Sequence, residues 1–151
     1  MIAIPISILS LSTSMPTSIK DLAELTKLGN RAKASLIIEA FPNHAPRGSL
    51  LVTLDCREFT CMCPLTHQPD FATLEIVYAP DRFVAESKSM KLYLETFRQV
   101  GVFHEHLAVD IANDFQKFIK PQWVSVTVAF NVRGGIAIRA THSLGKRPSG
   151  V

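Results

Sequence analysis

Apolar and polar residues alternate along two stretches of the chain, as they do in strands with one buried face. In the stretch 124–132 every second residue is apolar: Val124, Val126, Val128, Phe130 and Val132. The stretch 71–78 alternates in the same way, with three large apolar residues on one face: Leu74, Ile76 and Tyr78. The run 50–56 is rich in residues that favour strands, and it predicts another strand ahead of these two.

Two stretches between these strands repeat with the helical period instead. The first has apolar residues at i, i+3, i+4 and i+7: Met90, Tyr93, Leu94 and Phe97. We expect Ser87 or Ser89 to cap this helix and Gly101 to end it. Pro121 predicts the end of the second helix. That helix carries one apolar stripe: Leu107, Ala108, Ile111, Ala112, Phe115 and Ile119.

The glycine pair Gly134-Gly135 predicts a hairpin turn, with 136–139 as the returning strand. The order strand, strand, helix, helix, strand, strand predicts an α+β fold, an antiparallel sheet with both helices on one face. We expect this domain to span residues 49–140, with an irregular connection over 57–69. A leading segment, 1–48, with a short helix at Ser18–Leu28 and then a loop, is expected before it. A tail, 141–151, is expected after it.

The composition fits one small domain without a strongly charged surface. The 151 residues are 47% hydrophobic and 19% charged, which is enough apolar material for a core. The net charge is +3, and the basic residues are scattered except for Arg139, Lys146 and Arg147, so we expect no nucleic-acid partner.

The N-terminal stretch is apolar, but it contains Pro5, has no basic residues and is too short to span a bilayer. It is a strand, an extension, or a segment ahead of a true start at Met15. We therefore expect no membrane segment. An odd number of cysteines favours a reducing compartment, and we expect the protein to be cytoplasmic.

Three cysteines fall in one short stretch: Cys56, Cys61 and Cys63. Cys56 ends an apolar run and fits a buried side chain. Cys63 lies outside the predicted elements, with Asp70 seven residues further on, and a carboxylate near a thiol can transfer protons. A zinc site of Cys61, Cys63 and His67 would have an unfavourable spacing and no second group of ligands, so we expect no metal.

Two further motifs carry candidate chemistry. Lys88 and Lys91 lie on one face at the start of the first helix, where a phosphate can bind, although an ordinary capped helix has the same pattern. The chain has no GxGxxG, so a dinucleotide would be bound without a Rossmann unit. Glu105, next to His104, could accept hydrogen bonds from a guanine-like edge, or it could simply begin a helix.

Taken together, the motifs resemble those of the short 7-cyano-7-deazaguanine reductases. The resemblance runs from about 50 to 138 and rests on EFTCMCPLTHQPDFATLEI, ESKSMKLYLETFR, FHEH and FNVRGGIAI, in that order. It implies the tunnelling fold (T-fold), whose ββααββ units associate through their sheets into barrels. It also implies a homo-oligomer, a decamer of two pentameric rings, with active sites between subunits. The implied reaction is the NADPH-dependent reduction of the nitrile of 7-cyano-7-deazaguanine to the primary amine, in queuosine biosynthesis.

The resemblance also implies roles for individual residues. Cys63 would be the nucleophile that forms a covalent thioimide, and Asp70 and His104 would transfer protons. The substrate would be bound by Ala85, Glu86, Ser87, His104 and Glu105. The NADPH would be bound by Lys88, Ser89, Lys91, Tyr93 and Arg133, with Arg133 near its phosphates.

Two residues depart from the family pattern. Cys61 replaces a serine, which brings a second thiol close to Cys63. His67 stands where the family often has glycine, and we expect the local turn to differ. The alternatives are a zinc enzyme similar to GTP cyclohydrolase I, and a non-catalytic purine-binding module of the same fold.

Overall fold

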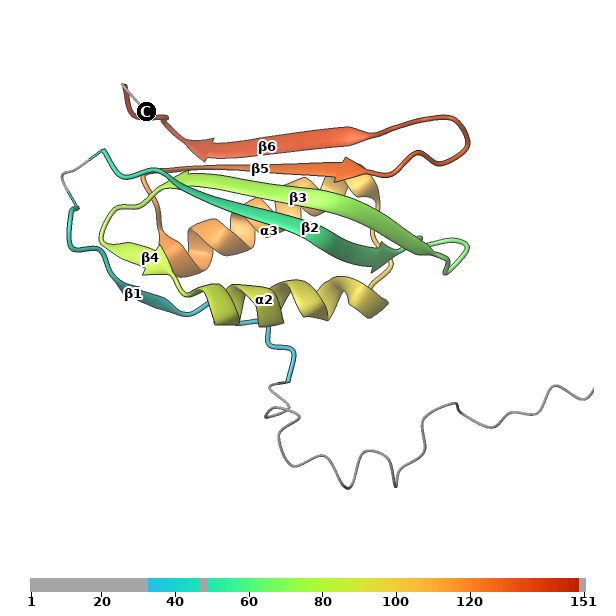
Figure 1. Ribbon diagram of the computed structural model, residues 1–151, viewed down its shortest axis with the longest axis horizontal. Coiled ribbons are helices and arrows are strands. Elements are labelled where there is room, and N and C mark those ends of the chain that lie inside the picture. The colour runs from blue at the N-terminus through green and yellow to red at the C-terminus, as the bar shows by residue number, and fades with distance from the viewer. Residues whose placement is uncertain (1–32, 47–48, 150–151) are drawn as a thin grey trace, which may run out of the picture. The chain divides into compact units, whose positions relative to one another are not determined.

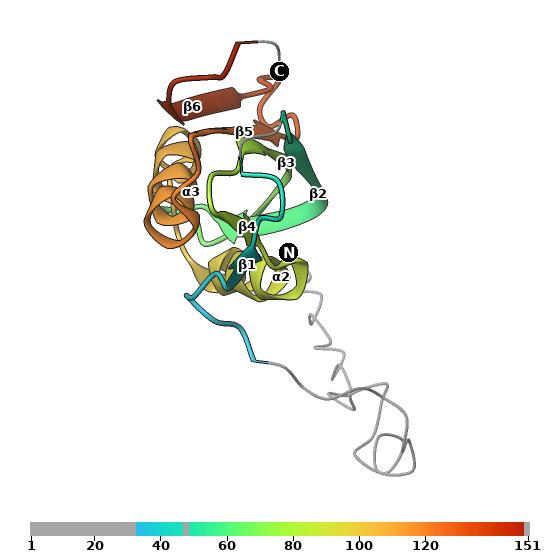
Figure 2. The same cartoon turned by 90° about the vertical axis from the view of Figure 1, so that its left-hand side faces the viewer.

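A four-stranded antiparallel sheet forms the centre of the computed structural model, which describes residues 33–46 and 49–149. The sheet order is β2-β3-β5-β6, with bounds Val52–Met62, Pro69–Ala79, Trp123–Phe130 and Arg139–Gly145. Helix α2 (Ser87–Glu95), the 3-10 helix η1 (Thr96–Gln99) and helix α3 (His104–Ile119) cover one face of it (Figure 1, Figure 2). The predicted α+β order is confirmed, whereas the helix expected at Ser18–Leu28 lies outside the described residues.

The core lies between this sheet and α3. The apolar positions of the two central strands and of the α3 stripe point toward each other, which removes their apolar surface from water. Tyr78 and Phe115, for example, pack edge to face with ring centroids 4.7 Å apart. The fully buried residues in this layer include Leu74, Ile76, Tyr78, Val124, Val126, Val128, Leu107, Ile111, Phe115 and Ile119.

The irregular connection predicted over 57–69 is wrong in its length. Strand β2 continues to Met62, past a bulge between Cys56 and Phe59. A bulge inserts a residue and breaks the alternation of the pattern, so the strand looked as if it ended early. The consequence for the site is that Cys61 lies in β2, directly opposite Asp70 in β3.

The described segments on either side of the predicted domain contribute more to the fold than their patterns indicated. The stretch expected to be a loop holds β1 (Ala40–Pro42), which pairs with β4 (Phe83–Ala85). Strand β6 begins at Arg139 and includes residues 141–145, which were expected to belong to the tail. Its inward positions are only half-buried, so its sequence has no strong apolar alternation.

The helix ends lie close to their predicted places but differ in detail. The side chain of Glu86, rather than Ser87 or Ser89, caps α2. Lys120, with φ 51°, ends α3 just before Pro121. No helix in residues 33–46 and 49–149 is long and apolar enough to cross a membrane.

Gly101 was expected to end the first helical stretch, but that stretch ends at Gln99 with Val100 as the C-cap of η1, and Gly101 has another role. Met62 donates its N–H to the carbonyl of Val100, and Val102 donates to the carbonyl of Met62, so this segment lies beside the end of β2. A Cβ at Gly101 would stand 2.9 Å from the Cα of Pro64, closer than real Cβ atoms come. Glycine here therefore lets the chain approach the residues that follow β2.

Candidate active site

Cys63 begins the tight loop that joins β2 to β3. Its N–H donates to the carbonyl of Gln68 at 2.9 Å, and its carbonyl accepts from the N–H of His67 at 3.0 Å. His67 has φ 54°, the left-handed region that glycine adopts easily. His67 therefore adopts a backbone conformation that suits glycine, the residue that the family often has here.

The surroundings of the three thiols differ in a way that singles out Cys63. Hydrogen bonds from the Thr66 hydroxyl and from the N–H groups of Thr66 and Leu65, with the charge of Arg133, lower the pKa of Cys63 to about 7. Burial, with nearby Asp70, raises the pKa of Cys61 to about 11. Burial also raises the pKa of Cys56. Only Cys63 therefore offers a substantial thiolate fraction at neutral pH.

Asp70 lies beside this loop, at the start of β3, and its side chain is only 5% exposed. One carboxylate oxygen, Oδ2, is 3.2 Å from Nε2 of His104, in the first turn of α3. The other oxygen, Oδ1, accepts from Nη1 of Arg133. The imidazole of His104 stacks on Phe130 of β5, with centroids 3.6 Å apart and planes within 10°. A carboxylate and an imidazole in contact can pass a proton between them.

The structure thus brings together four of the residues selected from the sequence: Cys63, Asp70, His104 and Arg133. Asp70 comes from β3 and His104 from α3, whereas Cys63 lies in the β2–β3 loop and Arg133 at the Gly134-Gly135 turn. Thr66, Gln68 and Phe130 complete this cluster, and sequence reasoning did not select them. Thr66 could have been selected because it lies close to Cys63 in the loop. No sequence signal points to Gln68 or Phe130.

A second group of selected residues lies at the start of α2. Ala85 is buried, and Ser87, Lys88 and Lys91 are exposed. The Glu86 carboxylate accepts from the N–H groups of Lys88 at 2.8 Å and Ser89 at 2.7 Å, and these bonds lower its pKa. The carboxylate therefore occupies the helix N-terminus. A phosphate at this place would be held by the positively charged ammonium groups of Lys88 and Lys91.

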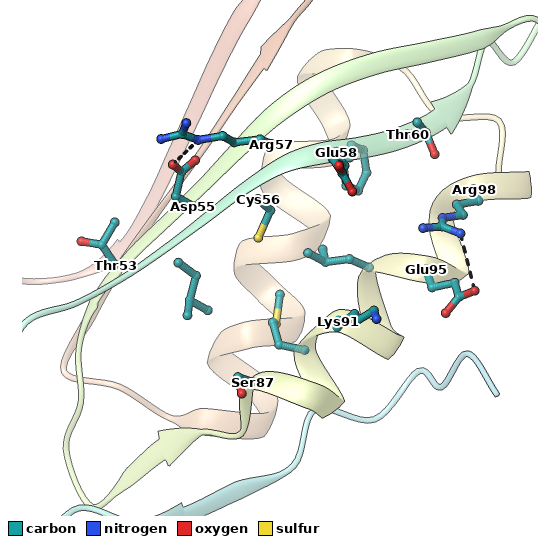
Figure 3. A pocket seen from close by; sticks show the side chains of 14 residues that line it. Thr53, Asp55, Cys56, Arg57, Glu58, Thr60, Ser87, Lys91, Glu95 and Arg98 are labelled. Atoms are coloured by element: carbon teal, nitrogen blue, oxygen red, sulfur yellow. Dashed lines mark hydrogen bonds and ion pairs between the residues drawn. The ribbon is translucent and has the colours of Figure 1, made fainter. Parts of the chain in front are cut away.

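A groove of about 630 Å³ runs between β2 and α2. Ser87 and Lys91 line it from the helix, and Cys56 lines it from the strand (Figure 3). Met90 and Leu94 also line it, with apolar side chains. Within residues 33–46 and 49–149, no three His, Cys, Asp or Glu side chains gather in a way that could hold a metal ion.

Ser89 and Tyr93, which the family motif places with the cofactor, are buried. The Ser89 hydroxyl accepts from the N–H of Glu39 at 2.9 Å and donates to the carbonyl of Glu86 at 2.8 Å. The Tyr93 hydroxyl donates to Oδ2 of Asp114 on α3 at 2.8 Å. Through these contacts, both side chains help to position α2.

The two groups of residues stand apart within the chain. Gly101 bridges to Met62, next to Cys63, whereas Glu86 begins α2 at the other end of the helical segment. Helices α2 and η1 together rise roughly 20 Å between these points, and Figure 1 shows this segment running along the sheet. Glu105 is exposed in the first turn of α3, beside His104. The structure does not bring Ala85, Glu86 and Ser87 to Cys63 of the same chain.

Comparison with known proteins gives consistent matches. The family described as QueF-like protein matches residues 69–149. An NADPH-dependent 7-cyano-7-deazaguanine reductase of Syntrophus aciditrophicus (strain SB) is 50% identical over 119 residues, which are 79% of this chain and 85% of that protein. One from Frankia casuarinae is 53% identical over 118 residues, 78% of this chain and 93% of that protein.

A solved structure supports the fold. The crystal structure of the archaeosine synthase QueF-Like in the apo form matches with a TM-score of 0.60 and 26% identity, over 65% of this chain and 96% of that one. The expected tunnelling-fold unit is confirmed. The sequence resemblance, the fold and the relatives agree, and the chain belongs to the family of the NADPH-dependent 7-cyano-7-deazaguanine reductases.

Proposed function

We propose that this protein reduces the nitrile of 7-cyano-7-deazaguanine to a primary amine, giving 7-aminomethyl-7-deazaguanine for queuosine biosynthesis in the cytoplasm. The observation that carries the proposal is the Cys63 thiol, with a pKa of about 7, in a loop that Arg133 joins to the Asp70–His104 pair. This arrangement combines a nucleophile at neutral pH with a route for protons. The names of the relatives supply the substrate and the cofactor.

The first step is the addition of the Cys63 thiolate to the nitrile. A bond forms between Sγ and the nitrile carbon, and one π pair of the triple bond moves to nitrogen. The nitrogen takes a proton from the Asp70–His104 pair, which leaves a covalent thioimide on Cys63. A nitrile is a poor hydride acceptor, and the thioimide is a better one, so this step divides a difficult reduction into easier ones.

NADPH, when bound, supplies the two hydrides that this four-electron reduction needs. After the first reduction the carbon–sulfur bond breaks, and Cys63 leaves as a thiolate, ready for another turnover. The substrate is then an imine, and after the second reduction it is the amine. His104 and Asp70 return protons to the nitrogen in these steps. Lys88 and Lys91 hold the cofactor phosphates, with Ser89 and Tyr93 placing the helix that carries them.

The active site forms between copies of the chain in this proposal. Ala85, Glu86 and Ser87 of one copy bind the substrate that is attached to Cys63 of the next, and Glu105 holds the guanine-like edge. The separation of roughly 20 Å between the two groups supports this, because a purine-sized molecule cannot span it. Strands β2 and β6 are the edges of the sheet, available for pairing between copies in a barrel. The assembly implied by the family resemblance is a decamer of two pentameric rings.

The test mixes the protein with 7-cyano-7-deazaguanine and measures the intact mass, then adds NADPH and follows its oxidation. We expect a covalent adduct without NADPH, and two NADPH consumed for each amine formed. Cys63→Ala should abolish both signals. Cys61→Ala is the matched control and should keep them. Loss of the adduct in Cys61→Ala alone, or one NADPH per product, would contradict the proposal.

A further inference from the structure

The guanidinium of Arg133 joins the loop after Cys63 to Asp70. Nη1 donates to the Asp70 carboxylate, and Nη2 donates to the Thr66 hydroxyl at 3.2 Å and the Gln68 side-chain carbonyl at 2.9 Å. All three acceptors lie within the stretch 66–70. The Asp70 side chain is 5% exposed and that of Arg133 41% exposed, so Arg133 covers a nearly buried carboxylate from the solvent side. A buried charge needs such a partner.

The backbone of Arg133 is itself fixed. Its N–H donates to the carbonyl of Ile136 at 2.9 Å, and the N–H of Ile136 donates back at 3.1 Å. Gly134 and Gly135 form the two-residue turn between them, with φ 58° and 82°. Two successive positive φ angles require residues such as glycine. The turn therefore presents the arginine to the Cys63 loop from a defined position.

Thr66 links Arg133 to the nucleophile. Its hydroxyl oxygen accepts from Arg133, which leaves the hydroxyl hydrogen free to point at the Cys63 sulfur. The other charged or titratable groups around the loop are Asp70, His104, His67 and the Cys61 thiol. Among these groups, Arg133 alone contacts both the acid and the residue that hydrogen-bonds the sulfur.

We propose that Arg133 is a positioning residue of the covalent step, which fixes the Cys63 loop against Asp70 so that the thiol can add to the nitrile. This inference rests on the proposed function and differs from the role that the family resemblance gave Arg133, near the cofactor phosphates. The two roles predict different defects. A positioning residue affects thiol reactivity and adduct formation without NADPH. A phosphate ligand affects only the reduction.

The experiment measures alkylation of Cys63 by iodoacetamide as a function of pH, in full-length protein without substrate, by peptide mass spectrometry. The wild-type midpoint should lie near pH 7. In Arg133→Gln we expect it about one pH unit higher, with adduct formation at pH 7 slowed roughly fivefold, because the thiolate fraction falls from about a half to about a tenth. Arg133→Lys should restore part of the shift, because it keeps the charge but not the three-way contact.

Two further variants sharpen the result. Arg139→Gln removes the same charge from an exposed position on β6, and should leave the alkylation midpoint and the adduct rate unchanged. Thr66→Val removes the hydroxyl that links Arg133 to the sulfur, and should raise the midpoint as well. If Arg133→Gln does not fold, Thr66→Val and Arg133→Lys decide the question.

Wild-type alkylation and adduct formation in Arg133→Gln, with a raised KM for NADPH, would overturn the inference and return Arg133 to the cofactor. A failure of the proposed function looks different. The wild-type protein would then form no adduct with the cyano base, while the alkylation profiles would still show whether Arg133 acts on Cys63.

Discussion

Asp70 is the residue on which the candidate site converges. Its two oxygens face different partners, the His104 imidazole on one side and the Arg133 guanidinium on the other. Its backbone pairs with Cys61, so the acid is held one residue pair away from the loop of the nucleophile. A carboxylate fixed by both side chain and backbone has little freedom to reorient, which suits a group that must deliver a proton to one atom.

Asp70→Asn tests this role. The amide has nearly the same shape but cannot exchange a proton, so we expect kcat to fall by roughly 10² to 10⁴. Steady-state NADPH oxidation measures the effect, with circular dichroism to check folding. Glu75→Gln makes the same chemical change on the exposed face of the same strand, and should leave kcat unchanged. Equal activity of Asp70→Asn and wild type would exclude Asp70 from the proton route.

For single residues, the sequence predicted which residues belong to the candidate site better than it predicted the contacts between them. Cys63 and Asp70 were found because they stand within one short motif. The contact of Arg133 with Asp70 spans 63 positions along the chain, and no local pattern reports such a pair. The family resemblance therefore gave Arg133 a place near the cofactor phosphates, and the structure places its side chain with the nucleophile loop.

The elements around the site show which patterns reveal a fold. Strands β3 and β5 are central, and each has one fully buried face, so their alternation was clear in the sequence. The edge strands were harder, for two different reasons. A bulge interrupts β2, and β6 buries its inward side chains only partly. Cys61 was therefore not assigned to a strand, and its pairing with Asp70 in the candidate site was not predicted.

The segment that follows η1 has a direct effect on the Cys63 loop through Gly101. In Gly101→Ala the new Cβ would meet the Pro64 backbone at 2.9 Å, so one of the two segments must move. We expect a loss of about 1–3 kcal/mol in the free energy of unfolding, together with slower adduct formation, because Pro64 follows Cys63. Urea denaturation and intact-mass kinetics measure the two effects.

Gln99→Ala, at an exposed position of η1, is the control for this change and should be near neutral in both measurements. If Gly101→Ala lowers stability but leaves the adduct rate unchanged, the contact with Pro64 does not govern the nucleophile loop.

On the scale of the whole molecule, the proposed function divides the candidate residues of the chain into two half-sites. Cys63, Asp70 and His104 form the first, at the end of β2. Ala85, Glu86 and Ser87 form the second, at the start of α2 (Figure 1). The residues of both groups could be predicted from the sequence, because each residue belongs to a local motif. The distance between the two groups could not be predicted, because it depends on the length of α2 and on the close approach of Gly101 to the end of β2.

Co-assembly of two impaired variants tests whether half-sites from different copies combine. Cys63→Ala lacks the nucleophile, and Glu86→Gln weakens the second half-site while keeping an oxygen that can cap α2. In mixed oligomers made by co-expression, some sites join the intact Cys63 half of one variant to the intact α2 half of the other. Random mixing in equal amounts makes about a quarter of all sites complete, so NADPH oxidation should recover to about that fraction of wild type.

The control pairs Cys63→Ala with Asp70→Asn, two defects that fall in the same half-site. Every site in such a mixture contains one defect or the other, whichever copy supplies that half, so no activity should return. If each active site were instead confined to one chain, neither mixture would recover, because every chain carries a defect. Recovery in the first mixture and none in the second therefore requires that Glu86 acts on a substrate bound to Cys63 of another copy.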